Sequence, residues 1–227
     1  EFIEHYFPGR IQQLLDNEVF VYAAVPYRIK AYQDILQNPK DTIDFDHALD
    51  TKIKETWTSL GADSALLKDK QGSIYHVNFM EKILATVLAK ISNFIPEGGI
   101  WMNTQRPEWN DANNALVGNG LSMVTLYYLR RFLTFFESLL QKSSIQEVKI
   151  SDELLTFFKE VYDLLLENKG ILNHSFTNKD RKRILDGLGL AGSKYRTQIY
   201  AHSFSNKKEA VTLKELLDFT LLSLGYL

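Results

Sequence analysis

LSMVTLYYLRRFLTFFESLLQ, residues Leu121 to Gln141, is the stretch that decides the fold class. Wound as a helix, it is apolar on most sides. A helix that is apolar nearly all round is buried nearly all round. We therefore predict a buried helix here, with helical patterns on both sides of it in the chain.

Those patterns repeat at steps of three or four residues, the spacing of one helix face. Ser151 precedes two acidic residues, which is a good helix start. Asn168-Lys169-Gly170 is predicted to end this helix, with Gly170 as its left-handed C-cap. Thr212 with Glu215 forms a capping-box pattern at the start of another helix. Predicted helices start near 42, 151 and 212 and span 78–94 and 121–141, with shorter ones at 26–37 and 178–185. Residues 18–24 are ambiguous between strand and helix.

We therefore predict an all-α fold of antiparallel helical hairpins, because successive helices joined by short loops usually pack in this way. The chain has 227 residues, no convincing repeat and no Pro-, Gly- or Ser-rich linker. One helical domain over 1–227 is the simplest interpretation.

Composition excludes several functional classes. Hydrophobic residues make up 45% and charged residues 24%, and the net charge of −2 provides no basic field for nucleic acid. The absence of cysteine excludes disulfides and Cys-ligated zinc, and the five histidines lack metal-binding spacing. No apolar run has the length of a membrane span. We predict no metal and no cofactor, and leave compartment and oligomeric state open.

The exception to the helical pattern is Ile95–Gly120, which contains RPEWNDANNALVGNG, residues 106–120. Long loops inside compact domains tend to be functional. Asp111 and Glu108 are the only carboxylates after Gly98 in this loop. An indole beside a carboxyl raises its pKa, as a general acid near neutral pH requires. A flat apolar face and polar donors suit a sugar ring, so Trp101, Trp109 and Arg106 are candidate sugar-binding residues.

The segment PEWNDANNALVGNGLSMVTLYYLRRF, residues 107–132, resembles the "DWNDGMN" segment of inverting sugar phosphorylases of the cellobiose phosphorylase type and of related six-hairpin (α/α)6 glycosidases. In both, a glycine-containing turn and a helix opening with Ser follow the motif. The resemblance implies that Asp111 is the general acid that protonates the glycosidic oxygen. It also implies that Trp109, Asn110 and Asn114 shape the sugar subsite, in part of an (α/α)6 toroid.

The sequence departs from that family before and after the Trp, where Glu108 and Ala112-Asn113 replace the usual residues. A complete toroid also needs more helices than we predict, so we expect an incomplete catalytic domain. An inverting glycosidase needs a second carboxylate about 6.5–9.5 Å from the acid, and a phosphorylase needs a phosphate pocket instead. The sequence leaves this partner open, with candidates at predicted helix ends: Asp44, Asp46, Glu97 and Asp186.

Two functions remain open from the sequence. The first is cleavage of a glycosidic bond in an oligosaccharide by inversion, through water or phosphate, with Asp111 and Glu108 as candidate catalytic residues. The second is a non-catalytic helical domain that binds a sugar or a protein partner. Purely structural roles also remain open for single residues. Asp111 can cap a helical turn, Arg106 and Glu108 can form a local ion pair, and the two tryptophans can be core residues.

Overall fold

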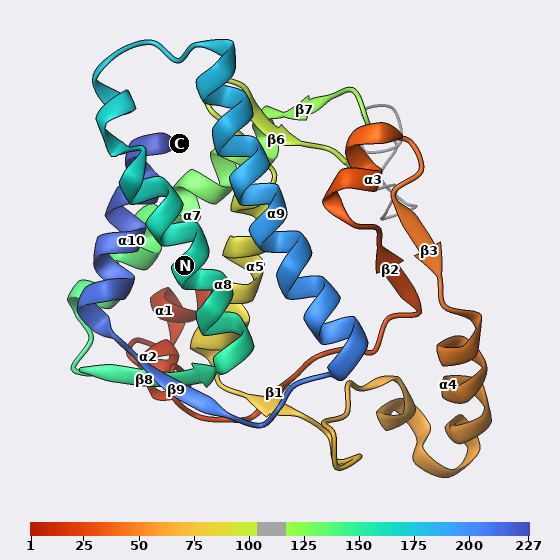
Figure 1. Cartoon of the computed structure of the whole chain (residues 1–227). Helices are drawn as coiled ribbons and strands as arrows, with labels where there is room; N and C mark the ends of the chain where they lie inside the picture. Colours follow the sequence, from red (N-terminus) through yellow and green to blue (C-terminus); the bar gives the residue numbers. More distant parts are fainter. Residues whose placement is uncertain (104–116) are drawn as a thin grey trace.

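The computed structural model describes residues 1–103 and 117–227 (Figure 1). Within this part the helices are α1 (Phe2–Tyr6), α2 (Arg10–Leu14), α3 (Tyr32–Gln37), α4 (His47–Leu60), α5 (Phe79–Ile91), α7 (Met123–Gln141), α8 (Asp152–Glu167), α9 (Asn178–His202) and α10 (Leu213–Tyr226), with short 3₁₀ helices η1 (Gly61–Ala65) and η2 (Lys169–Asn173).

Strands also occur, so the predicted all-α fold of toroid hairpins is wrong. In the described ranges, β1 (Phe20–Val21) pairs with β4 (His76–Val77), and β2 (Tyr27–Ile29) pairs with β3 (Ile43–Phe45). The strands β5 (Phe94–Ile95), β6 (Gly99–Trp101) and β7 (Leu121–Ser122) form a three-stranded sheet, and β8 (Glu147–Ser151) pairs with β9 (Lys208–Thr212). All these ladders are antiparallel. The fold is mixed α and β, with helices as the larger part.

Helices α5, α7, α8 and α10 surround the main core (Figure 1). Leu133 and Phe136 of α7 are almost fully buried, as its apolar pattern predicts, and they join Phe158 of α8 and Phe219 of α10. The prediction of burial nearly all round is too strong, however, because one side of α7 exposes Val124, Tyr127 and Tyr128. The β8–β9 ladder lies under one end of this bundle in Figure 1.

Helix α9 runs across the front of the bundle in Figure 1 and continues well beyond the predicted end at 185. Glycines let it approach its neighbours closely. A Cβ on Gly187 would lie 2.6 Å from a Leu164 methyl of α8, and one on Gly189 would lie 2.2 Å from the Tyr32 ring of α3. Close packing therefore outweighs the low helix propensity of glycine in this stretch.

The segment 26–37, predicted as one helix, is strand β2 followed by the shorter α3. Similarly, the predicted helix start near 42 lies just before β3, and α4 begins at His47 with Asp46 as its cap. Gly170 is not among the glycines with positive φ, and the chain continues as η2 instead of ending in a left-handed cap. The elements α4, η1, β2 and β3 stand away from the bundle, on the right in Figure 1.

Candidate functional site

The part of the predicted catalytic loop that carries its motif, residues 104–116, lies outside the described residues. This applies to both candidate catalytic residues and to most of the candidate sugar-binding set, namely Arg106, Glu108, Trp109, Asn110, Asp111 and Asn114. Their roles stay predictions. Trp101 is described, and so are the residues on which the two ends of the loop rest.

The two ends of this loop are held together by backbone hydrogen bonds. The Met102 N–H donates to the Gly120 carbonyl at 3.0 Å, and the Gly118 N–H donates to the Met102 carbonyl at 2.7 Å. The half-buried Trp101 adds its indole N–H, which donates to the Gly118 carbonyl at 3.2 Å. These contacts give Trp101 a structural role, the pinning of the loop base. Ser122 then caps α7 by accepting from the Thr125 N–H.

The four candidate second carboxylates lie on different elements. Each one is in an ion pair with a neighbouring cation: Asp44 with Lys30, Asp46 with Arg28, Glu97 with Arg181, and Asp186 with Lys182. Asp46 also caps α4 by accepting from the Leu49 N–H at 3.0 Å, and Asp186 accepts from the Tyr32 hydroxyl at 2.8 Å. Structural contacts therefore occupy all four, and the fold does not gather them into one site.

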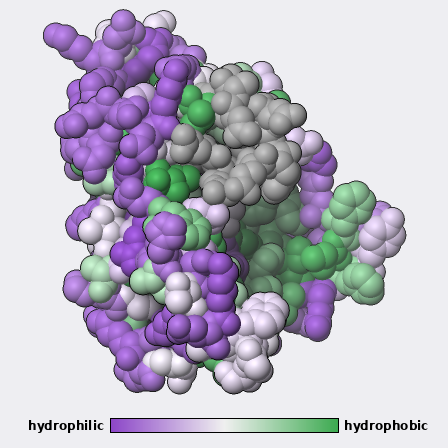
Figure 2. All heavy atoms as spheres, turned by 90° about the vertical axis from the view of Figure 1, so that its right-hand side faces the viewer, coloured by the Kyte–Doolittle hydropathy of each residue, from purple (hydrophilic) through white to green (hydrophobic). Residues whose placement is uncertain are grey.

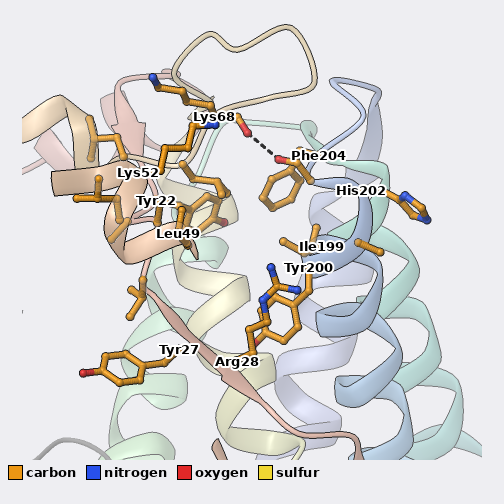
Figure 3. A pocket seen from close by; sticks show the side chains of 18 of the residues that line it. Tyr22, Tyr27, Arg28, Leu49, Lys52, Lys68, Ile199, Tyr200, His202 and Phe204 are labelled. Carbon is orange, nitrogen blue, oxygen red and sulfur yellow. Dashed lines mark hydrogen bonds between the residues drawn. The ribbon is translucent and has the colours of Figure 1, made fainter. Parts of the chain in front are cut away.

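A pocket with a volume of about 640 Å³ lies between α4 and η1 on one side and the C-terminal end of α9 on the other (Figure 3). We call it the α4–α9 pocket. Leu49 and Ile53 of α4 lie on one wall, and Ile199 and Tyr200 of α9 lie on the other. The Ser203 hydroxyl donates to the Lys68 carbonyl at 2.6 Å and ties the two walls together, as the dashed line in Figure 3 marks.

Aromatic rings form the rigid part of the pocket. The buried Phe204 ring is stacked between Tyr22 and Tyr75, with centroid distances of 5.6 Å and 4.3 Å. The guanidinium of Arg28 lies 5.7 Å from the centroid of the Tyr200 ring, and the Tyr200 hydroxyl accepts from the Ile29 N–H. Such contacts are worth about 0.5–1.5 kcal/mol each beyond the burial of area, so the wall keeps its shape without a ligand.

The charged side chains that line the pocket are all basic in the described residues. Arg28 is neutralised by Asp46 at 2.6 Å. Lys52 and Lys68 extend at the same end of the pocket in Figure 3, and neither has an ion pair with a described residue. The His202 ring points away from the pocket. No Asp, Glu, Asn or Gln occurs among the described lining residues.

A cluster of buried polar side chains lies near the Tyr22 side of the pocket. Glu81 of α5 is fully buried and accepts from the N–H of Ser151 at 2.9 Å and from its hydroxyl at 2.8 Å. Burial raises the pKa of Glu81. Burial, and next the negative charge of Glu81, raise the pKa of the Tyr22 hydroxyl. Because Glu81 holds Ser151, the N-cap residue of α8, we assign this carboxylate a structural role.

Sequence reasoning missed the α4–α9 pocket. Its residues come from the segment 22–28, from α4, from the stretch after η1 and from the far end of α9. No motif connects these segments. The only local signal is a pair of aromatic residues in each of two short stretches, EVFVYAA and QIYAHSF, and that signal is also typical of ordinary core residues.

The described residues contain no group of three or more His, Cys, Asp or Glu side chains that is arranged to hold a metal ion. In the same part of the chain no helix is long and apolar enough to cross a membrane. No protein-family model matches the chain, and no curated protein matches it either.

Proposed function

We propose that the chain binds a small amphipathic anion in the α4–α9 pocket. The ligand has an aromatic or aliphatic body and one carboxylate or phosphate group. The observation that carries the proposal is the lining itself, which is apolar and aromatic with two lysines that lack an ion pair among the described residues. The pocket also has the usual volume of a small-molecule site, about 300–1,000 Å³.

The two halves of such a ligand match two parts of the pocket. Leu49, Ile53 and Ile199 offer an apolar surface to the body, which gains free energy by leaving water. Lys52 and Lys68 offer ammonium groups to the anionic group. A hydrogen bond to a charged partner is worth about 1.5–3 kcal/mol, which corresponds to roughly tenfold to 150-fold in affinity.

A neutral sugar is a poorer match to this pocket. Sugar hydroxyls need both donors and acceptors in fixed directions; amide side chains provide both, and carboxylates provide acceptors. The described lining contains neither kind. We therefore do not assign the predicted oligosaccharide to the α4–α9 pocket.

The test is a matched pair of probes that differ only in charge. Isothermal titration calorimetry compares 4-phenylbutyrate with its neutral amide, 4-phenylbutanamide. We expect the acid to bind at least about tenfold more tightly. The double substitution Lys52→Ala with Lys68→Ala should remove that preference and leave the weak binding of the amide unchanged. The control is Lys54→Ala, also on α4, where the ammonium group is exposed and paired with Asp50.

Equal affinity for the acid and the amide would refute the proposal. So would an acid preference that survives in the double variant, because the anionic group would then bind elsewhere. Lys52 is exposed and Lys68 is partly exposed, and neither side chain has a hydrogen bond or ion pair with a described residue, so the double variant should fold.

We also propose, on a separate observation, that the chain cleaves a glycosidic bond by inversion with Asp111 as general acid. The observation is the segment WNDANN, Trp109 to Asn114, followed by a glycine turn and a helix that opens at Ser122. The described flank is compatible with it, since Gly118 has φ of +83° and Ser122 is the N-cap of α7. A rigid base of this kind suits a loop that must hold an acid in place.

This second proposal is tested with a panel of aryl glycosides and disaccharides, with and without inorganic phosphate. Asp111→Asn should abolish turnover and leave saccharide binding intact, because the amide keeps the size of the side chain and lacks the proton to transfer. Glu55→Gln on the exposed face of α4 is the control. No saccharide turnover by the unaltered chain, or full turnover by Asp111→Asn, would refute it.

A further inference from the structure

Arg196 of α9 is a largely buried cation without an anion. In the described part of the chain its guanidinium has no ion pair, and its Nε–H is shut off from solvent without a hydrogen-bond acceptor. Burial lowers the pKa of Arg196 from its ordinary value. A guanidinium stays charged in proteins all the same, and an uncompensated charge in such a place is strongly unfavourable. The arrangement calls for a counter-ion.

Arg196 lines a second cavity of about 110 Å³, whose walls come from β2, α5, α8 and α9 and from the segments that follow α5 and β6. This is room for a few water molecules, and so for a carboxylate or phosphate group. The cavity is placed by its lining residues, and Figure 2 shows the side of the molecule on which α3 and α4 lie, where the surface has a hollow with apolar groups at its floor. We call this second cavity the Arg196 cavity. Of the described residues it shares only Tyr195 with the α4–α9 pocket.

The fold makes room for this guanidinium. Gly192, one turn before Arg196, has no side chain, and a Cβ there would lie 3.2 Å from Nη1 of Arg196 and 3.0 Å from the Ser92 hydroxyl oxygen. Arg196 therefore folds back over its own helix toward the end of α5. A larger side chain at 192 would push the guanidinium away from the cavity.

Two amides complete the lining. The Asn103 side-chain N–H donates to the side-chain oxygen of Asn93 at 2.6 Å, and the Asn93 amide donates to the Ala89 carbonyl at 3.1 Å. Each amide nitrogen carries a second N–H, for which no described residue is an acceptor. No carboxylate lines the cavity among the described residues. The cavity thus combines one cation with spare neutral donors and lacks a negative charge.

We propose that the Arg196 cavity is a binding site for a small oxyanion, a carboxylate or phosphate group held by the Arg196 guanidinium and the amides of Asn93 and Asn103. Planar N–H groups of guanidinium suit both anions, because they donate in pairs to two oxygens. This site is distinct from the α4–α9 pocket and stands whether or not that pocket binds a ligand.

The test measures thermal unfolding and calorimetric binding of the full chain with sodium phosphate, sodium acetate or sodium chloride at equal ionic strength and pH. A ligand that binds the folded state raises Tm. We expect phosphate, acetate or both to raise Tm by about 3 °C or more above chloride at saturation. The responding anion identifies the group that the site takes, and a response to either one supports the proposal.

Arg196→Met removes the charge and keeps much of the volume. Its Tm in chloride should equal or exceed that of the unaltered chain, because an uncompensated buried charge has been removed, and the oxyanion response should vanish. Arg196→Lys keeps the charge and should weaken binding about tenfold, because the planar fork is lost. Arg183→Met, on the same helix but exposed and paired with Asp180, should respond like the unaltered chain.

Two results would overturn the proposal. The first is an unaltered chain that responds to neither oxyanion beyond its response to chloride. The second is an Arg196→Met or Arg196→Lys variant with an undiminished response. Arg196→Lys retains a cation at the site, so it decides the question even where the Met variant folds poorly.

Discussion

Substitution of Glu81 gives the sharpest test of how the bundle is assembled. Glu81 is a fully buried carboxylate of α5, and it accepts both the N–H and the hydroxyl of Ser151, at 2.9 Å and 2.8 Å. Ser151 is the N-cap of α8 and is also fully buried. Replacing Glu81 with Ala removes both acceptors at once.

The magnitude follows from those two bonds. A buried donor left without an acceptor costs about 1–3 kcal/mol. The Ser151 N–H and hydroxyl are both affected, so Glu81→Ala should lower the free energy of unfolding by about 3 kcal/mol or more. The lost side-chain volume adds to this cost. Glu81→Gln should cost less, because its amide oxygen keeps one acceptor in place.

The pH dependence has a defined sign. Burial, the largest cause, raises the pKa of Glu81 above its ordinary value of 4.5. The folded protein therefore holds the Glu81 proton more tightly than the unfolded chain. The stability from this group is fully present below pH 4.5 and is lost as pH rises through the folded-state pKa. The stability advantage over Glu81→Gln should thus shrink with rising pH.

The assay is urea unfolding followed by circular dichroism at several pH values from 4 to 8, about five points. Taking the difference from Glu81→Gln cancels the other titrating groups, and Glu55→Gln, exposed on α4, serves as the control. A Glu81→Ala variant within about 0.5 kcal/mol of the unaltered chain would refute the argument. An advantage over Glu81→Gln that grows with pH would refute its sign.

Three further substitutions test the packing. Gly189→Ala should destabilise the protein by about 1–3 kcal/mol through overlap with the Tyr32 ring, whereas Gly170→Ala, which has open space around it, should not; urea unfolding of both variants decides. Phe204→Ala should cost about 3–5 kcal/mol by removing the middle of a three-ring stack, and near-ultraviolet circular dichroism should show the loss of fixed aromatic packing. Gly118→Ala should lower Tm, because the backbone there has φ of +83° and a Cβ would lie 2.7 Å from a carbonyl oxygen of the turn after α3.

The helices that could be predicted are those specified by near neighbours in the chain. Ser151 accepts from the Leu154 N–H, three residues on, and Thr212 with Glu215 forms the predicted capping box. The apolar stripes of α5, α7 and α8 repeat within one or two turns. These interactions are visible in any short window of sequence, so their prediction is confirmed.

The strands could not be predicted in the same way. Phe20–Val21 is a strand only because His76–Val77 lies beside it. In the sequence, β8 is separated from its partner β9 by both α8 and α9. Strands of two to five residues are too short to show an alternation of apolar and polar residues that would predict them. A prediction built on period alone therefore produced an all-α fold.

The candidate sites likewise divide into one that rests on consecutive residues and two that are formed by distant segments of the chain. The chemistry of Asp111 and its neighbours is proposed from consecutive residues and stays a prediction. The α4–α9 pocket and the Arg196 cavity were not predictable, because their walls come from elements far apart in the chain. Whether Arg196 is paired or unpaired depends on every side chain around it.

By itself, the sequence determined where most of the larger helices begin and which of their faces are apolar, because capping and amphipathic spacing act over three or four residues. Only the tertiary structure decided the four small sheets of the described residues, the full length of α9 and the position of both cavities. Strand pairing and cavity walls depend on contacts between distant segments, and the free energy of such contacts exists only once the chain has folded.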